Sequence, residues 1–140
     1  MNILLDTNVV VDIISKRDGY ADSLQVLAYC ETGRAKGFVS AVTVTDVMYI
    51  LRKHISPDAV RSAVQTLLLI VNVEDVLKSD ISTAFKSDVR DFEDAVQVSC
   101  AGRINADYIV TRNVKDFGNS AVPAISPVDI LKILGDVGDA

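Results

Sequence analysis

The feature that most constrains the fold is at the start of the chain, where Ile3, Leu4 and Leu5 run directly into Asp6. A second apolar segment begins at Val9. A short apolar run that meets a polar turn and then another apolar segment is typical of a buried strand leading into a helix. Asp6 then ends the strand, where open parallel sheets carry their ligand-binding groups. An acid at this point can equally cap the helix that follows, and the sequence leaves both interpretations open.

The rest of the chain alternates between helical patterns and short apolar runs. The apolar runs predict further strands at about 37–40, 69–73, 106–110 and 122–125, the last one an edge strand. Helical patterns cover about 7–15, 20–31, 43–51, 57–68, 75–87, 91–102 and 127–134. Strands separated by helices indicate a parallel sheet covered on both faces. We therefore expect an α/β fold, a three-layer α/β/α sandwich with a parallel sheet of about five strands.

Length and charge restrict the classes of protein to consider. With 140 residues, 49% of them hydrophobic, the sequence predicts a single domain over residues 1–140, with 135–140 as a frayed tail. A net charge of −5 argues against a broad basic face that holds nucleic acid, so a polyanionic substrate needs a local basic patch or bound cations. The apolar run 67–71 is too short to span a bilayer, and we expect no membrane association and a cytoplasmic protein.

Several residues that could take part in chemistry are expected to have structural roles. Cys30 and Cys100 lack the spacing of a zinc site and are interpreted as small buried thiols. His54 is expected at the carboxyl end of a helix, where it favours the helix dipole. We expect the four tyrosines to be packing residues rather than platforms for base stacking; they are Tyr20, Tyr29, Tyr49 and Tyr108.

Carboxylates fall at four places that the predicted topology brings to one edge of the sheet. Asp6 ends the first strand, and Asp46 lies in the helix after the second. Asp94 follows Asp91 by three residues, so both share one face at the start of a helix. The fourth, Asp116, follows the fourth strand. Each acid also has a structural interpretation. Asp46 can be a half-exposed residue on the polar side of its helix, and the acids near residue 91 can simply cap their helix and favour its dipole.

A cluster of carboxylates has a specific chemical use. Like charges repel, so such clusters are normally stabilised by divalent cations. Oxygen ligands without histidine or cysteine favour Mg²⁺ or Mn²⁺. These ions activate water and neutralise charge that develops on phosphate, which is the chemistry of nucleases.

Four segments together resemble the PIN domain family and, within it, the VapC-like ribonuclease toxins of toxin–antitoxin systems. They are LLDTN, TVTDVMYILRK, DFEDAVQVSCA and ADYIVTRNVKDF, and with their spacing they cover nearly the whole chain. The resemblance implies a Mg²⁺- or Mn²⁺-dependent endoribonuclease that cleaves single-stranded or structured RNA, and the toxin of a type II pair. It also implies a homodimer and a small antitoxin protein that inserts a segment at the acidic cleft.

The resemblance assigns roles to individual residues. Asp6, Asp94 and Asp116 would hold the ion, and Asp46 would bind it directly or orient the attacking water. The family usually has glutamate at the second position, so Asp46 shortens the reach by one methylene. The fourth acidic position is either Asn113 or Asp116, and Asp116 is taken as the acid. Thr7, Asn8, Asp91, Thr111 and Asn113 are expected to support the site, with Arg112 and Lys115 either contacting substrate phosphate or remaining solvated.

Three other classes of protein are alternatives to this interpretation. A phosphatase of the haloacid dehalogenase type needs a second aspartate two residues after the first, where this chain has Asn8. A receiver domain needs an acceptor aspartate at the end of its third strand, where Asn72 stands. The serious alternative is a PIN fold without catalysis that acts as a partner-binding module, which the shorter Asp46 keeps open.

Overall fold

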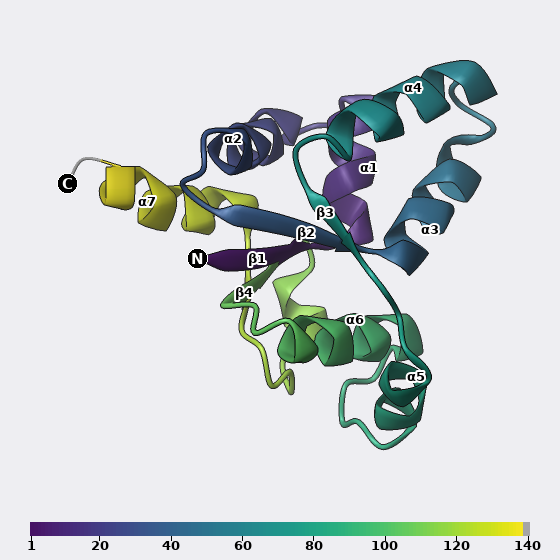
Figure 1. Cartoon of the computed structure of the whole chain (residues 1–140), viewed down its shortest axis with the longest axis vertical. Helices are drawn as coiled ribbons and strands as arrows, with labels where there is room; N and C mark the ends of the chain where they lie inside the picture. Colours follow the sequence, from purple (N-terminus) through teal and green to yellow (C-terminus); the bar gives the residue numbers. More distant parts are fainter. Residues whose placement is uncertain (139–140) are drawn as a thin grey trace.

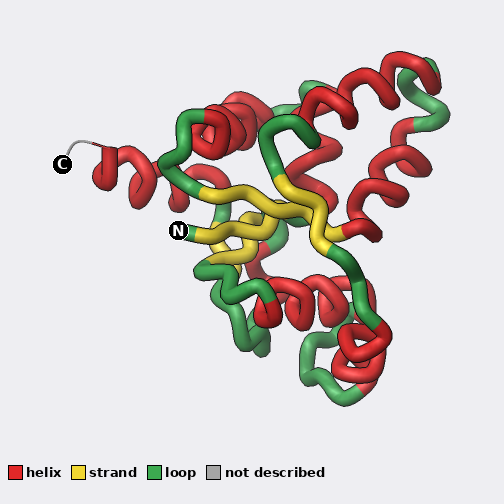
Figure 2. Tube along the Cα trace, in the orientation of Figure 1, coloured by secondary structure: helices red, strands yellow, loops and turns green. Residues whose placement is uncertain are grey.

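The computed structural model shows five parallel strands between two layers of helices (Figure 1). It describes the backbone of residues 1–138 and the side chains of residues 1–135. The strands lie together at the centre of the molecule (Figure 2), in the order β3-β2-β1-β4-β5. Their bounds are β1 Asn2–Leu5, β2 Lys36–Ser40, β3 Asn72–Glu74, β4 Tyr108–Val110 and β5 Ala124–Ile125. The predicted parallel sheet of five strands is therefore confirmed, with β5 at one edge.

The helices divide between the two faces of the sheet. One face is covered by α1 (Thr7–Ser15), α2 (Tyr20–Glu31), α3 (Ala41–Leu51), α4 (Pro57–Leu67) and α7 (Pro127–Gly138). The other is covered by α5 (Lys78–Phe85), α6 (Phe92–Arg103) and the short 3₁₀ helix η1 (Val114–Phe117). This arrangement is the α/β/α sandwich that the sequence predicted.

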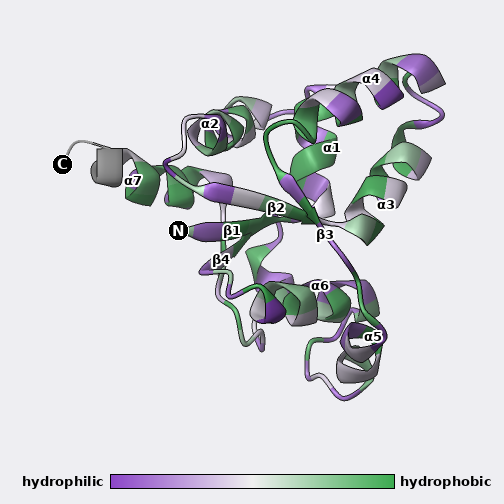
Figure 3. Ribbon diagram, viewed as in Figure 1, coloured by the Kyte–Doolittle hydropathy of each residue, from purple (hydrophilic) through white to green (hydrophobic). Residues whose placement is uncertain are grey.

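The alternation of side chains along β1 builds both halves of the core. Ile3 and Leu5 point into one layer and Leu4 into the other, and all three are fully buried. Burial of each such side chain contributes about 1.5–3 kcal/mol. Figure 3 shows hydrophobic residues along β1 and β2 and on the nearby helices. The apolar run at the start of the chain is thus the centre of the core.

Close packing of α2 on the sheet explains why residue 37 is a glycine and why Cys30 is buried. A Cβ atom at Gly37 would lie 2.8 Å from Cys30 Sγ and 2.8 Å from a methyl group of Val71, so only glycine fits there. Cys30 and Cys100 are both buried free thiols, as predicted. Burial raises the pKa of the Cys30 thiol to about 11, which keeps it protonated and inert.

The predicted third strand was wrong in its position. Leu68 caps α4 and residues 68–71 form a turn, in which Ile70 N–H donates to Leu67 O at 2.9 Å. Leu69 is 86% exposed, and β3 begins only at Asn72. A short apolar run does not distinguish the end of a helix from a strand, and here its first residues complete the helix.

Other boundaries differ by smaller amounts. The third helix begins at Ala41, because Ser40 Oγ accepts the Thr43 N–H and caps it, and not at Thr43 or Thr45. The helix predicted over 75–87 is shorter, since α5 covers Lys78–Phe85. The tail predicted to fray from Gly135 instead continues α7 to Gly138, and residues 139–140 lie outside the described residues. Within residues 1–138, no helix is both long enough and apolar enough to cross a membrane.

Candidate active site

Asp6 lies at the carboxyl end of the central strand and also caps a helix. Leu5 pairs with Val110 of β4, and the Asp6 N–H extends this pairing by donating to Val110 O at 2.9 Å. Its Oδ1 accepts the Thr7 N–H at 2.8 Å and so caps α1. Both interpretations of Asp6 from the sequence are therefore correct for its position.

Two side chains from distant parts of the chain bind the same carboxylate. Gln97 Nε2 donates to Asp6 Oδ1 at 2.9 Å, and Thr111 Oγ1 donates to Asp6 Oδ2 at 2.8 Å. Asp6 is only 6% exposed. Burial raises the pKa of Asp6 above its usual 3.8, and the hydrogen bonds, which lower the pKa, only partly offset that effect. Asp6 is thus a buried, oriented carboxylate whose ionisation is costly.

Thr111 joins the end of β4 to the start of α1. Its hydroxyl is fully buried and accepts from Asn8 Nδ2 at 3.3 Å and from the Asn113 N–H at 3.1 Å. Asn8 Oδ1 in turn accepts the Arg112 N–H at 3.2 Å. These bonds hold together the two turns that follow β1 and β4. Thr111 and Asn8 therefore keep Asp6 in place.

The acids predicted from the first, third and fourth segments line one cleft. The cleft measures about 350 Å³ and opens at the carboxyl edge of the sheet. Asp6, Asp94 and Asp116 line it, and so does Asp91, which caps α6 by accepting the Asp94 N–H at 3.0 Å. The predicted supporting residues Thr7, Asn8 and Asn113 also lie in its wall, together with Arg112.

Asp94 shows how strongly these charges interact. Burial, which is the larger cause, and nearby negative charges together raise the pKa of Asp94 to about 7. These charges belong to Asp6, Asp91 and Asp116, in decreasing order of influence. A carboxyl group with a pKa near neutrality marks a place where a cation would stabilise the ionised form.

Asp46 reaches the site from the other helical layer and meets an acid that the sequence analysis missed. Its carboxyl group lies next to Glu93 on α6, and this neighbour, followed by burial and by the charges of Asp91 and Asp94, raises the pKa of Glu93 to about 7. The Oδ2 atom of Asp46 is buried without a hydrogen-bond partner. Glu93 lines the cleft, whereas Asp46 lies beside Glu93 and is not one of the lining residues, so this predicted acid is not brought into the cleft itself.

The two predicted phosphate-binding residues lie at the rim. Arg112 is about half exposed, at 48% of its side chain, and its Nη1 pairs with Asp12 Oδ1 at 3.3 Å. Lys115 is exposed and lines an adjoining hollow, which shares Asp91 and Asp116 with the cleft. Arg112 is therefore partly neutralised by Asp12, whereas Lys115 faces solvent.

Gln97 and Glu93 are the site residues that sequence reasoning did not find. Gln97 is 2% exposed and donates to Asp6, while its Oε1 is buried without a partner. The available signal was helical spacing, because Gln97 follows Asp94 by three residues and therefore shares its face. Glu93 looked like one more acid in the first turn of a helix, which the dipole alone explains.

The donors in this cleft suit a hard divalent cation. They are carboxylate, amide and hydroxyl oxygens, which Mg²⁺ and Mn²⁺ prefer, and the orphaned Oδ2 of Asp46 is a free acceptor at their side. As the side chains stand, no three acids, histidines or cysteines within the described part of the chain converge closely enough to grip an ion. The donor chemistry fits an ion that draws these carboxylates together.

Comparisons with known proteins agree with this geometry. The chain resembles solved structures of toxin–antitoxin proteins, among them VapBC2 from Rickettsia felis bound to a DNA fragment from its promoter, with a TM-score of 0.70, 20% identity and coverage of 90% of this chain and 98% of that one. DNA-bound VapBC from Salmonella typhimurium gives a TM-score of 0.71 and 15% identity over 91% of this chain and 98% of that one. At these identities the likeness shows the fold alone.

A third structure carries an activity in its description. VapC20 from Mycobacterium tuberculosis, a toxin that cleaves the sarcin–ricin loop, matches with a TM-score of 0.63 and 16% identity over 76% of this chain and 86% of that one. A search of curated proteins gives no match. The family model of the PIN domain matches residues 2–115, which is most of the chain. This chain therefore belongs to the PIN domain family.

Proposed function

We propose that this protein is a Mg²⁺- or Mn²⁺-dependent endoribonuclease that cleaves single-stranded or structured RNA. The observation that carries the proposal is the cleft in which Asp6, Asp94 and Asp116 lie together, with a pKa of about 7 at Asp94. Such mutual repulsion is costly without a cation, and an acidic protein needs a cation to bind a polyanion. When bound, the ion would activate water and neutralise charge that develops on the phosphate.

The roles of the residues follow from their places in the cleft. Asp6, Asp94 and Asp116 would hold the ion, while Thr111 and Gln97 keep Asp6 oriented through its two oxygens. Glu93, in the wall of the cleft, and Asp46, beside it, would accept hydrogen bonds from the attacking water or bind the ion. Thr7, Asn8, Asp91 and Asn113 shape the turns around the site. Lys115 and Arg112 at the rim would contact substrate phosphate.

The cellular role is proposed from the structural relatives. Two of them are VapBC pairs on DNA and a third is an RNA-cleaving toxin. By the same logic this chain acts in the cytoplasm as the toxin of a type II pair, forms a homodimer, and is neutralised by a small antitoxin whose basic side chain enters the acidic cleft.

The test is cleavage of a fluorescent single-stranded RNA by the pure protein in Mg²⁺, in Mn²⁺ and in EDTA, beside an Asp6→Asn variant. We expect cleavage that needs metal and is lost in the variant, because the amide keeps the shape but not the charge. Asp129→Asn is the matched control, since Asp129 is an exposed acid on α7 that pairs only with Lys132. A metal-induced rise in melting temperature is an independent readout, also expected to disappear in Asp6→Asn.

The second candidate is a PIN fold without catalysis that binds a partner. The observation in its favour is that no three acidic groups converge on one point among residues 1–135, whose side chains the structure describes. If neither cleavage nor a metal-induced shift in melting temperature is found across several RNAs, this candidate replaces the nuclease, and Asp6 remains as a helix cap.

A further inference from the structure

The outer end of α3 exposes an aromatic ring that the sequence analysis assigned to packing. Tyr49 is 65% exposed, so the expectation that it packs in the core was wrong. The core side of α3 is formed by Thr43, Val47 and Leu51, which places Tyr49 on the opposite side of the helix. A tyrosine that lies outside the core has an exposed ring to offer a ligand.

A cation already occupies one face of that ring. The Arg52 guanidinium lies 3.6 Å from the ring centroid and donates to the Tyr49 carbonyl. This contact holds the ring and leaves its other face open.

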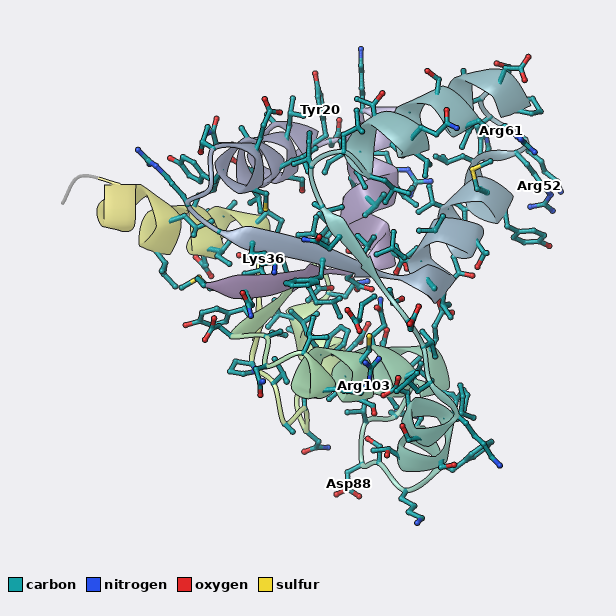
Figure 4. The ribbon with its side chains drawn as sticks, in the orientation of Figure 1. Tyr20, Lys36, Arg52, Arg61, Asp88 and Arg103 are labelled. Carbon is teal, nitrogen blue, oxygen red and sulfur yellow. The ribbon has the colours of Figure 1, made fainter. Side chains whose placement is uncertain are left out.

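Further cations surround the same end of the helix. Lys53 follows in the turn, and Arg61 lies on α4 at the same corner of the molecule (Figure 4). Asp58, at the start of α4, is the acid of this corner. Among the described residues, Arg52, Lys53 and Arg61 take part in no ion pair, whereas Arg103, Arg112 and Lys132 each do. In a chain with a net charge of −5, this gives a local excess of positive charge.

The same helix connects this corner to the acidic cleft. Asp46, Tyr49 and Ile50 lie at the spacing of one face of α3, which ends at Leu51, and Lys53 follows in the turn. Asp46 lies next to Glu93, and Ile50 lines the cleft itself. The rise along α3 from Asp46 to Tyr49 is about 4.5 Å. A strand whose phosphate lies at the carboxylates therefore passes Tyr49 within its neighbouring nucleotides.

We propose that Tyr49 and Arg52, with Lys53 and Arg61, bind the RNA strand next to the cleaved phosphate. The open face of the Tyr49 ring stacks on a base, and the cations contact the backbone, which is how single strands are bound without sequence preference. The inference rests on the proposed function for its substrate class. An acidic protein segment would use the cations but has no base to stack on the ring, so the exposed ring favours RNA.

The test measures the binding of a short fluorescein-labelled single-stranded RNA by polarisation, with Asp6 intact and with Ca²⁺, which also binds oxygen ligands, in place of Mg²⁺ to prevent cleavage. Tyr49→Ala is expected to weaken binding on the order of tenfold, and Tyr49→Phe to preserve it. Arg52→Ala is expected to weaken binding and to reduce the slope of log affinity against log salt by about 0.7. On an abasic strand of the same length, Tyr49→Ala should cost nothing.

The chain offers a matched control at the opposite edge of the sheet. Arg34 lies over the Tyr29 ring at 4.8 Å, but it precedes β2 and is therefore far from the cleft. Arg34→Ala should leave RNA binding unchanged. Circular dichroism of all variants checks that they are folded.

The outcomes separate this inference from the proposed function. Unchanged binding by Tyr49→Ala, or an equal loss from Arg34→Ala, overturns the inference even if the wild type cleaves RNA. A loss on the intact strand that disappears on the abasic strand supports the inference even if the wild type never cleaves, in which case the nuclease proposal alone fails. Absence of RNA binding by all variants overturns the inference.

Discussion

Glu93 on α6 lies next to Asp46 on α3, so carboxyl groups from opposite helical layers meet beside the cleft. Glu93 is one methylene longer than Asp46. Because Glu93 lines the cleft and Asp46 does not, we expect Glu93 to supply the reach that aspartate at position 46 lacks. The two acids therefore act on each other, and a change in one alters what the other contributes.

Asp46→Asn and Glu93→Gln are expected to be non-additive in stability. Without metal at pH 8, each substitution removes the same repulsion, worth about 1 kcal/mol for two close charges in water. The double variant should gain no more than one single variant, as a denaturation cycle would show. Fully additive gains would mean that the two carboxyl groups act independently.

The stability of the metal-free protein should fall as the pH rises toward neutrality. The pKa of Asp94 is about 7 in the folded protein against 3.8 as its ordinary value. Between these values the folded state binds more protons than the unfolded state, so its contribution is favourable at acidic pH and is lost as the pH rises through 7. Melting temperatures from pH 5 to pH 8, without metal, measure this.

Asp94→Asn separates this contribution from other titrations. The amide cannot ionise, so the variant should melt on the order of 3 °C higher than the wild type at pH 8 and show a flatter pH profile. Saturating Mg²⁺ should remove most of the difference by stabilising the wild type. If Asp94→Asn melts lower than the wild type at pH 8, Asp94 is not under electrostatic strain.

The substitution Thr111→Val leaves every carboxylate of the site in place, yet it is expected to impair activity. Valine removes the donor to Asp6 Oδ2 and the acceptor for Asn8 Nδ2, so Asp6 loses its orientation. Loss of such a supporting bond lowers activity or metal affinity roughly 10- to 100-fold. The measurement is kcat/KM on RNA with a metal titration. Thr66→Val is the control, because Thr66 Oγ1 bonds only to a carbonyl of its own helix.

Arg103→Ala tests stability on the side of the molecule away from the cleft. Arg103, on α6 (Figure 4), pairs through Nη2 with Oδ2 of Asp80 on α5 at 3.1 Å, and Asp80 is almost fully buried. Burial raises the pKa of Asp80, but hydrogen bonds from the Leu77 N–H, Arg103 and Ser99 outweigh it and leave the pKa below 3.8. Without Arg103 the buried charge is uncompensated, which costs about 3 kcal/mol.

Urea denaturation of Arg103→Ala measures this cost. Because the pKa of Asp80 is lowered, the stabilisation should be present at neutral pH and disappear as the pH falls below 4. Arg34→Ala should cost far less, since Arg34 pairs with no carboxylate within the described residues. An equal cost for the two arginines would contradict the special role of Asp80.

The sequence predicted the layers of the fold and the edge at which the acids meet. Ile3 to Leu5 are continuous and apolar because both faces of β1 are covered, and Asp6 follows because the chain there leaves the core. The same transition from apolar to polar after Val110 located Thr111. These predictions succeed because burial determines them, and burial is visible in residue type.

Other features depend on packing that the sequence does not show. Residues 68–71 are as apolar as a strand, yet Leu68 caps α4 and the residues after it form a turn, because only the tertiary contacts decide between strand and turn. Helical spacing places Gln97 beside Asp94, but not the carboxylate of Asp6 opposite it. The interaction of Glu93 with Asp46 can be recognised only when α3 and α6 are placed together in the fold.

The bond between Thr111 and Asp6 spans 105 residues of chain. During synthesis on a ribosome, Asp6 emerges almost at once, but its partner on β4 is made only after most of the polypeptide. A nascent chain that stops before β4 keeps an aspartate with neither its neighbouring strand nor its donor. The proposed active site is therefore among the last parts of the protein to be assembled, and an incomplete translation product does not carry it.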